Sequence, residues 1–228
     1  MNYDNLKAIF NLGRPITEDS KFSYIHYAYK YKPDNYRLIT SGELFIRGRN
    51  LQIPQYLVQF MSFHGEAIMM ANIIADKVIN IVFRSINTNK EFMKVGSMKS
   101  TFYGLGKLSK DFKYGDTILL VEGHLDRDMM STIFPNTLGI MTSHLSKNQV
   151  ELLKGLTNKF ILMLDNDEAG KKGQSYAKYQ LKGCKISELK HDISLKDAGD
   201  LVKLDITNHS KFEEIVNDYK LQIELFNL

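Results

Sequence analysis

Short apolar runs that alternate with amphipathic segments fill the second half of this 228-residue chain and limit its fold more than any other feature. The first run, Thr117-Ile118-Leu119-Leu120-Val121, is continuously apolar after its first residue, which is typical of a strand buried on both faces. Strands are expected at residues 117–121, 137–141, 160–164 and 184–189, and helices at about 125–134, from Ser146 onward and at 169–181, with short helices in the remainder. Strands that alternate with helices of this length predict an α/β fold with a parallel sheet.

Acidic residues directly follow two of these predicted strands. Glu122-Gly123 comes after the first, and Asp165-Asn166-Asp167 comes after the third. In open α/β sheets, sites form beyond the carboxyl ends of the strands, so the three acids would converge if the two strands are neighbours. An isolated Asp-x-Asp is more often a turn or a helix N-cap, but acids after two buried strands favour a site. Oxygen ligands without His or Cys favour Mg²⁺ or Mn²⁺.

The composition is that of an ordinary globular protein, with 43% apolar and 25% charged residues. No apolar run is long enough to cross a membrane, and the N-terminus lacks the apolar segment of a secretory signal. We therefore expect a cytoplasmic protein without a membrane partner. The single cysteine, Cys184, excludes an internal disulfide and a zinc ribbon built from this chain's own cysteines.

Charge is divided unequally along the chain. Residues 1–115 contain 16 Lys and Arg against 9 Asp and Glu, whereas residues 116–228 contain 14 against 17. A basic half followed by an acidic half fits a polyanion-binding surface beside a carboxylate metal site, and a lysine-rich solvated surface is the alternative. We expect a basic α+β subdomain at 1–115, an α/β domain at 116–205 and a C-terminal helical tail at 206–228. In the first part, strands are expected at 36–40, 43–47, 78–84 and 91–95, and a helix at 54–63.

The acidic motifs resemble those of the Toprim fold, which bacterial-type primases, topoisomerases and several nucleases share. The residues that carry this resemblance are Val121-Glu122-Gly123, with Asp126 downstream, and Leu164-Asp165-Asn166-Asp167-Glu168-Ala169-Gly170. The Asp-x-Asp-x-Ala-Gly form is similar to that of DnaG-type primases. Phe102-Tyr103-Gly104-Leu105 resembles the Leu-Tyr-Gly-Leu segment that precedes the Toprim strand in those primases. The resemblance covers about residues 78–203.

A further segment, residues 195–201, resembles the Lys-Asp-Pro-Asp segment of these primases. It departs from the family because Ala198-Gly199 stands where the family has proline, which shifts the second acid. Asp200 is therefore not included among the expected ligands, and Asp197 is.

The resemblance implies a Toprim-type parallel sheet with flanking helices, preceded by the smaller basic subdomain. It implies that Glu122, Asp165 and Asp167 are catalytic. Together with Asp197 they would hold Mg²⁺ or Mn²⁺, and no zinc is expected. It also implies contacts to nucleic acid or triphosphate by Arg84, Lys94, Lys99, Lys107 and Lys196, for each of which an ordinary surface position is the alternative.

The leading function is then a primase-like, DNA-dependent RNA polymerase core, a nucleotidyltransferase that makes short primers on single-stranded DNA from nucleoside triphosphates. The alternatives are a Toprim nuclease that cleaves phosphodiester bonds and a non-catalytic replication accessory protein. No Gly-x-x-x-x-Gly-Lys phosphate loop is present, so the chain is not itself an ATP-driven helicase. A small core without a zinc ribbon suggests a phage-like protein that works with a replicative helicase or a separate zinc-ribbon protein.

Overall fold

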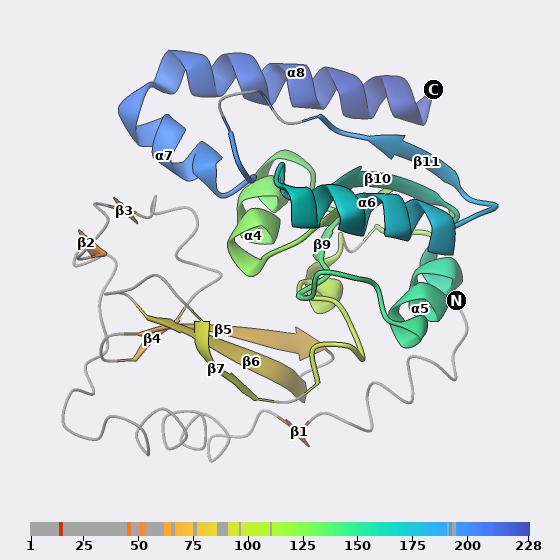
Figure 1. Ribbon diagram of the computed structural model, residues 1–228, viewed down its shortest axis with the longest axis horizontal. Helices are drawn as coiled ribbons and strands as arrows, with labels where there is room; N and C mark the ends of the chain where they lie inside the picture. The colour runs from red at the N-terminus through yellow and green to blue at the C-terminus, as the bar shows by residue number, and fades with distance from the viewer. Residues whose placement is uncertain are drawn as a thin grey trace. The chain divides into compact units, whose positions relative to one another are not determined.

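The computed structural model describes residues 97–109, 111–190, 192 and 195–228 and, before residue 97, the strands alone (Figure 1). The chain forms two compact units, one built from residues 8–97 and the other mainly from residues 98–228. None of the described helices is long and apolar enough to cross a membrane.

The N-terminal unit contains an antiparallel sheet in the order β1-β6-β5-β4, with β7 paired to β6. Its strands are β1 Arg14–Pro15, β4 Ser62–His64, β5 Ala67–Ile74, β6 Lys77–Ser85 and β7 Glu91–Val95, and a separate pair joins β2 Phe45–Ile46 to β3 Leu51–Gln52. The strands predicted at 78–84 and 91–95 are confirmed by β6 and β7, and β2 lies within the strand predicted at 43–47. The strand predicted at 36–40 lies outside the described residues.

The helix predicted at 54–63 is wrong at its end. Ser62 and Phe63 belong to β4, where Phe63 pairs with Ile68 across an antiparallel hairpin. Pairing with β5 therefore decides the conformation of these residues, and the rest of the predicted helix lies outside the described residues.

The C-terminal unit contains the predicted parallel sheet. Its four strands are β8 Ile118–Val121, β9 Thr137–Gly139, β10 Lys159–Met163 and β11 Lys185–Glu188, and every neighbouring pair is parallel. The connecting helices are α4 His124–Ile133, α5 Lys147–Leu156 and α6 Glu168–Gln180. All four residues of β8 are buried, as expected of a central strand covered on both faces. The α/β fold with a parallel sheet and flanking helices is thus confirmed (Figure 1).

The strand order is β11-β10-β8-β9, so the chain runs outward from β8 in one direction and from β10 in the other. The point between β8 and β10, where the direction changes, is where the connecting loops diverge and leave a crevice. Right-handed connections then place α4 on one face of the sheet and α6 on the other.

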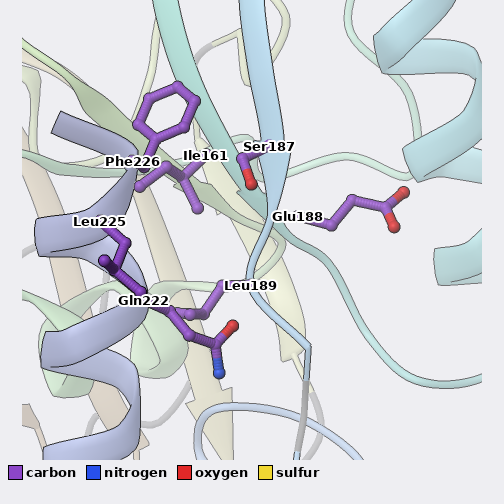
Figure 2. A pocket seen from close by; sticks show the side chains of 7 residues that line it. All are labelled: Ile161, Ser187, Glu188, Leu189, Gln222, Leu225 and Phe226. Atoms are coloured by element: carbon purple, nitrogen blue, oxygen red, sulfur yellow. The ribbon is translucent and has the colours of Figure 1, made fainter. Parts of the chain in front are cut away.

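Alternating side chains of β11 show that α6 and α8 His209–Asn227 cover opposite faces of the sheet. Glu188 forms an ion pair with Lys178 of α6. Ser187, Glu188 and Leu189 also line a pocket of about 290 Å³ together with residues of α8, and Figure 2 shows the Glu188 side chain pointing away from that helix. Successive side chains of a strand point to opposite faces, so the two helices sandwich the sheet.

The C-terminal segment contains one short helix, α7 Asp200–Thr207, and the long helix α8. The expectation of short helices alone is wrong for α8, which has 19 residues. Its buried residues are Phe212, Ile215, Val216, Tyr219 and Ile223, a helical spacing that forms one apolar stripe. The helix packs onto the sheet unit, where the Thr117 hydroxyl donates a hydrogen bond of 2.5 Å to Asn227.

The segment of residues 98–109 packs with the parallel sheet, although the sequence placed it with the basic subdomain. Tyr103 and Gly139 of β9 exchange two backbone hydrogen bonds, of 2.9 and 3.0 Å. Phe102 and Tyr103 are fully buried in the core of this unit. The compact units therefore divide between Ser97 and Met98 rather than near residue 115.

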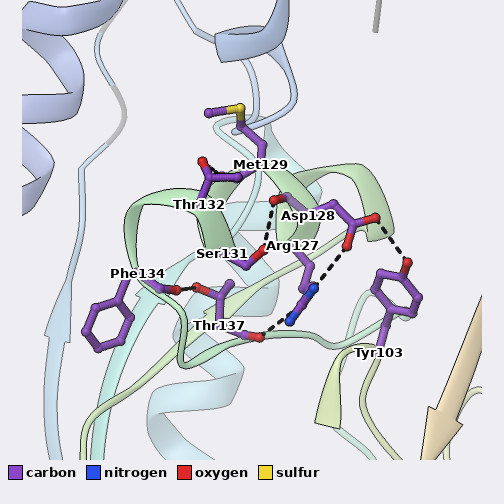
Figure 3. Close-up of polar contacts among 8 residues, drawn as sticks. All are labelled: Tyr103, Arg127, Asp128, Met129, Ser131, Thr132, Phe134 and Thr137. Atoms are coloured by element: carbon purple, nitrogen blue, oxygen red, sulfur yellow. Dashed lines mark hydrogen bonds and ion pairs between the residues drawn. The ribbon is translucent and has the colours of Figure 1, made fainter. Parts of the chain in front are cut away.

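A buried polar network fastens this segment to α4 (Figure 3). The Tyr103 hydroxyl donates to Asp128 (3.0 Å), and Arg127 donates to Asp128 (3.1 Å) and to the carbonyl of Thr137 (3.2 Å). Arg127 and Asp128 are 1% and 0% exposed, so the two charges compensate each other away from water. Gly104, with φ of 86°, fits here because a Cβ would lie 2.2 Å from Nε of Arg127.

Candidate functional site

The two acidic motifs lie side by side at the carboxyl edge of the parallel sheet. β8 and β10 are hydrogen-bonded neighbours, with Val121 opposite Met163. Glu122 directly follows β8, and Asp165 lies two residues after β10. The condition on which the sequence argument depended, that these two strands are adjacent, is therefore confirmed. The acids also lie at the switch point of the strand order, where open α/β sheets place their sites.

Glu122 lies against the start of the second acidic loop. Its carboxylate accepts a hydrogen bond from the backbone N–H of Asp165. Burial raises the pKa of Glu122, and the charges of Asp126 and Asp167 raise it further, while Lys196 opposes them. This carboxylate thus holds a proton more readily than an exposed glutamate does.

Asp165 has the more strongly perturbed carboxylate of the second motif. Burial raises the pKa of Asp165 to about 7, with further contributions from the charges of Glu122 and Asp197. The loop after it is tight, because a Cβ on Gly170 would lie 2.0 Å from the backbone oxygen of Asp165. Only glycine allows the first turn of α6 to approach this loop so closely.

Asp167 has a different environment although it is only two residues away. It is the N-cap of α6, and its carboxylate accepts a hydrogen bond of 2.9 Å from the N–H of Gly170. That hydrogen bond lowers the pKa of Asp167, and the charge of Lys196 adds to the effect. Asp167 is therefore a helix N-cap, as the alternative interpretation of the motif expected, and it also lies at the edge of the acid cluster.

Among the predicted phosphate-binding residues of the C-terminal unit, Lys196 lies beside these acids. Its Nζ lies 3.6 Å from the carboxylate of Asp167, and its side chain is 62% exposed. Its backbone oxygen accepts a hydrogen bond of 2.7 Å from the N–H of Asn166. Desolvation lowers the pKa of Lys196, but the charges of Asp165, Asp167 and Asp197 outweigh it and raise that pKa. The ammonium group is therefore charged and faces both the acids and the solvent.

Asp126 is a component of the site to which the sequence argument assigned no role. Its carboxylate accepts hydrogen bonds from the N–H of Gly123 (2.9 Å) and the N–H of Gly199 (2.7 Å). Burial raises the pKa of Asp126 to about 7, and the charges of Asp197 and Asp165 contribute. Asp126 thus ties the loop after β8 to residues 195–199. Its position at N3 of a helix whose N-cap is Gly123 is the signal that could have indicated this role.

Asp197 and Asp200 shape the loop that carries Lys196. Asp197 accepts a hydrogen bond of 3.0 Å from the N–H of Asp200, and Asp200 accepts one of 3.1 Å from the N–H of Lys196. Both carboxylates thus stabilise the turn into α7. Asp197 also contributes to the electrostatic field on Asp126 and Asp165, which places its charge with the cluster.

The cluster has the chemistry of a divalent-cation site in an open arrangement. Its donors are carboxylate oxygens whose mutual repulsion raises the pKa of Glu122 and of Asp165, and a dication would relieve this repulsion. Within the described residues, no three His, Cys, Asp or Glu side chains are gathered tightly enough to enclose a cation in this conformation. The residues therefore fit Mg²⁺ or Mn²⁺ in donor type but do not enclose a cation in this conformation.

The other predicted basic residues have surroundings that differ from those of Lys196. Lys99 and Lys107 are exposed on the segment that packs against β9, where the carbonyl of Lys99 accepts a hydrogen bond of 2.6 Å from the Ser146 hydroxyl. Lys107 lies 6.0 Å from the centre of the Tyr103 ring, and desolvation lowers its pKa while the charge of Asp128 opposes that shift. Lys94, exposed on β7, and Arg84, on β6, belong to the other compact unit, so the structure does not place either against the acids.

Comparison with known proteins agrees with this geometry. Residues 119–202 match the model of the Toprim-like family. Among solved structures, the chain is similar to the DnaG catalytic core, with a TM-score of 0.55 and 17% identity over 71% of this chain and 57% of that one. It is also similar to the primase fragment of the bacteriophage T7 primase-helicase protein, with a TM-score of 0.54 and 19% identity over 80% of each chain.

A third similar structure is a DnaG primase catalytic domain bound to single-stranded DNA, with a TM-score of 0.54 and 15% identity over 95% of this chain and 83% of that one. The chain thus spans less than two thirds of the first of these proteins and about four fifths of the other two. A search of curated proteins finds no match. Residues 119–202 therefore match the Toprim-like family, and the fold of the chain is similar to that of DnaG-type primase catalytic cores.

Proposed function

We propose that this chain is a primase-like nucleotidyltransferase that joins nucleotides into short primers on a single-stranded DNA template. One observation carries the proposal: Glu122 and the Asp165–Asp167 loop lie beside each other after two adjacent parallel strands. The fold around them is shared with primase catalytic cores. The conclusion that the chain is an enzyme of the transferase class rests on both.

The residues of the cluster have complementary roles in this reaction. The 3′ hydroxyl of the growing strand attacks the α-phosphorus of the incoming triphosphate, a new P–O bond forms, and pyrophosphate leaves. Glu122 would accept the proton of that hydroxyl on its carboxylate, and its raised pKa supports this role. Lys196 is exposed and charged, so it can bind a phosphate oxygen of the triphosphate.

We further propose that Glu122, Asp165 and Asp167, with support from Asp197, hold Mg²⁺ or Mn²⁺. When bound, the cation would stabilise negative charge on the phosphates and orient the leaving group. Gly123 and Gly170 lack side chains beside these acids, which leaves the backbone close to the place where phosphates would approach. Asp126 holds the loop of Lys196 against the β8 loop and acts as a positioning residue.

The test is primer synthesis by the purified chain with single-stranded DNA, ribonucleoside triphosphates and Mg²⁺ or Mn²⁺. We expect labelled oligoribonucleotides from the wild type and a loss of at least about 100-fold in Asp165→Asn. Asp111→Asn is the matched control, because Asp111 is an exposed aspartate in a surface loop. Shortened DNA without synthesis would instead identify a nuclease. If the chain with a helicase or a zinc-ribbon protein gives neither product, it is an accessory protein.

The same comparison supports a proposal about the binding partners of this chain. One similar structure is a primase domain bound to single-stranded DNA, and another is part of a primase-helicase protein. We propose that a helicase or a separate zinc-ribbon protein delivers the template to this chain, because nonspecific contacts from basic residues alone bind DNA weakly, with Kd on the order of 10⁻⁴–10⁻⁶ M. Adding such a partner should raise the synthesis rate through effective concentration.

A further inference from the structure

Two tyrosines on α6 are exposed on the surface of the protein. Tyr176 and Tyr179 are 47% and 75% exposed, and among the described aromatic residues only Tyr114, at 65%, is comparable. The two rings lie three residues apart, so they are neighbours along one side of the helix. The ring of His144 lies 5.5 Å from that of Tyr176 and extends the aromatic surface.

The opposite side of α6 explains why these tyrosines are not part of the core. The helix packs inward through small residues, Gly170, Gly173 and Ala177. A Cβ on Gly173 would lie 2.7 Å from the backbone oxygen of Ser143, so the helix approaches its neighbours as closely as backbone allows. Replacing an outward-facing tyrosine should therefore leave the fold intact.

The tyrosines lie in a shallow hollow with lysines, which we call the α6 hollow. It has a volume of about 590 Å³ and is lined by Glu168, Lys171, Lys172, Ser175, Tyr176 and Tyr179. Residues 168, 172, 175 and 179 follow one helical stripe, so the hollow runs along α6 rather than across it. Lys171 and Lys172 lie at the end nearest to Asp167, the N-cap of the same helix. The surface thus begins one helical turn from the acid cluster.

We infer that the α6 hollow binds single-stranded nucleic acid that extends from the acid cluster, with bases stacked on Tyr176 and Tyr179 and phosphates paired with Lys171 and Lys172. Flat aromatic faces spaced along a groove with cations are the arrangement by which proteins bind unpaired strands without reading sequence. A duplex keeps its bases stacked on one another and cannot offer them to these rings. The inference rests on the proposed function, because it names where the single-stranded template would lie, and none of these residues takes part in the chemistry proposed for the acids.

The test is equilibrium binding of a fluorescein-labelled oligothymidylate to the full chain, without triphosphate or divalent cation. Stacking contributes enough that alanine substitution costs roughly 5- to 150-fold in affinity per stacked base. We expect Tyr176→Ala/Tyr179→Ala to weaken binding at least about fivefold, and Tyr176→Phe/Tyr179→Phe to restore it. Lys171→Gln/Lys172→Gln should reduce the slope of log affinity against log salt by roughly 1.4. Tyr114→Ala is the matched control and should bind normally, since Tyr114 does not line the hollow.

Thermal unfolding of each variant should match the wild type, which separates lost binding from lost folding. Unchanged oligothymidylate affinity in the tyrosine double variant would overturn the inference. An equal loss of affinity for a matched duplex would also overturn it, because duplex bases cannot stack on the rings. Competition by polyglutamate as strong as that by oligothymidylate would overturn it in favour of an acidic peptide. Binding is measured without triphosphate or divalent cation, so its outcome does not depend on whether the chain makes primers, and the two proposals fail independently.

Discussion

Asp165 and Asp167 are two residues apart in one loop, yet replacing each by asparagine should change stability in opposite directions. Burial and the charges of Glu122 and Asp197 raise the pKa of Asp165 to about 7, from an ordinary value of 3.8. Among the described residues, its carboxylate accepts no hydrogen bond that asparagine would lose. Asp165→Asn removes a charge that the folded state disfavours, so without metal the variant should be more stable than the wild type near pH 8.

The magnitude follows from the pKa of Asp165. A rise from 3.8 to about 7 corresponds to at most roughly 4 kcal/mol above pH 7, at about 1.4 kcal/mol per pKa unit. Because the carboxylate is partly solvated, we expect a gain of about 1–3 kcal/mol. The folded state binds more protons than the unfolded state between about pH 4 and pH 7. The stability of the wild type therefore decreases as pH rises through this window, and the advantage of the variant disappears near pH 4.

Asp167→Asn should be slightly destabilising instead. The N–H of Gly170 and the charge of Lys196 lower the pKa of Asp167, so its charged form contributes to stability. Asparagine is about as good an N-cap as aspartate, and the loss is limited to the charge at the start of the helix, about 0.3–1 kcal/mol.

The assay is urea unfolding of both variants and the wild type, followed by circular dichroism, in EDTA at pH values from about 4 to 8. Adding Mg²⁺ should then stabilise the wild type, because the cation offsets the repulsion, and should stabilise Asp165→Asn much less. If Asp165→Asn is less stable than the wild type near pH 8, or its effect does not change with pH, the electrostatic account of the cluster is refuted. The same conclusion holds if both variants shift stability in the same direction.

Three further predictions concern other parts of the structure. Arg127→Met should destabilise the protein by about 3–5 kcal/mol in urea unfolding, because it leaves Asp128 buried without its cation. Adding Asp128→Leu to this variant should recover much of the lost stability. If it recovers none, the ion-pair argument is contradicted. Gly170→Ala should abolish primer synthesis and lower the Tm, since the new Cβ would lie 2.0 Å from the Asp165 backbone oxygen; a fully active variant would show that the loop is not tight. Lys196→Gln should raise the KM for triphosphate about tenfold in steady-state kinetics, with a smaller change in kcat. An unchanged KM would show that Lys196 does not bind a phosphate of the triphosphate.

Local sequence determined much of the C-terminal unit. The runs that became β8 and β10 are apolar at almost every position, so they are stable only when both faces are covered. Ser146 was expected to open α5 and is its N-cap, where its hydroxyl accepts a hydrogen bond from the N–H of Gln149. These features depend on residues close together in the chain, and for that reason the pattern is sufficient to predict them.

Only the tertiary structure decided which segments meet. Asp126 is an ordinary first-turn acid in the sequence, and it becomes a link in the site because folding brings Gly199, 73 residues away, to its carboxylate. Residues 98–109 carry the charge of the basic half, yet they pack with the parallel sheet because Tyr103 pairs with β9. The acids follow their strands in the sequence, but their proximity depends on β10 pairing with β8 rather than with β9. Strand order and long-range hydrogen bonds arise from packing the whole unit, and a local pattern of residues does not contain that information.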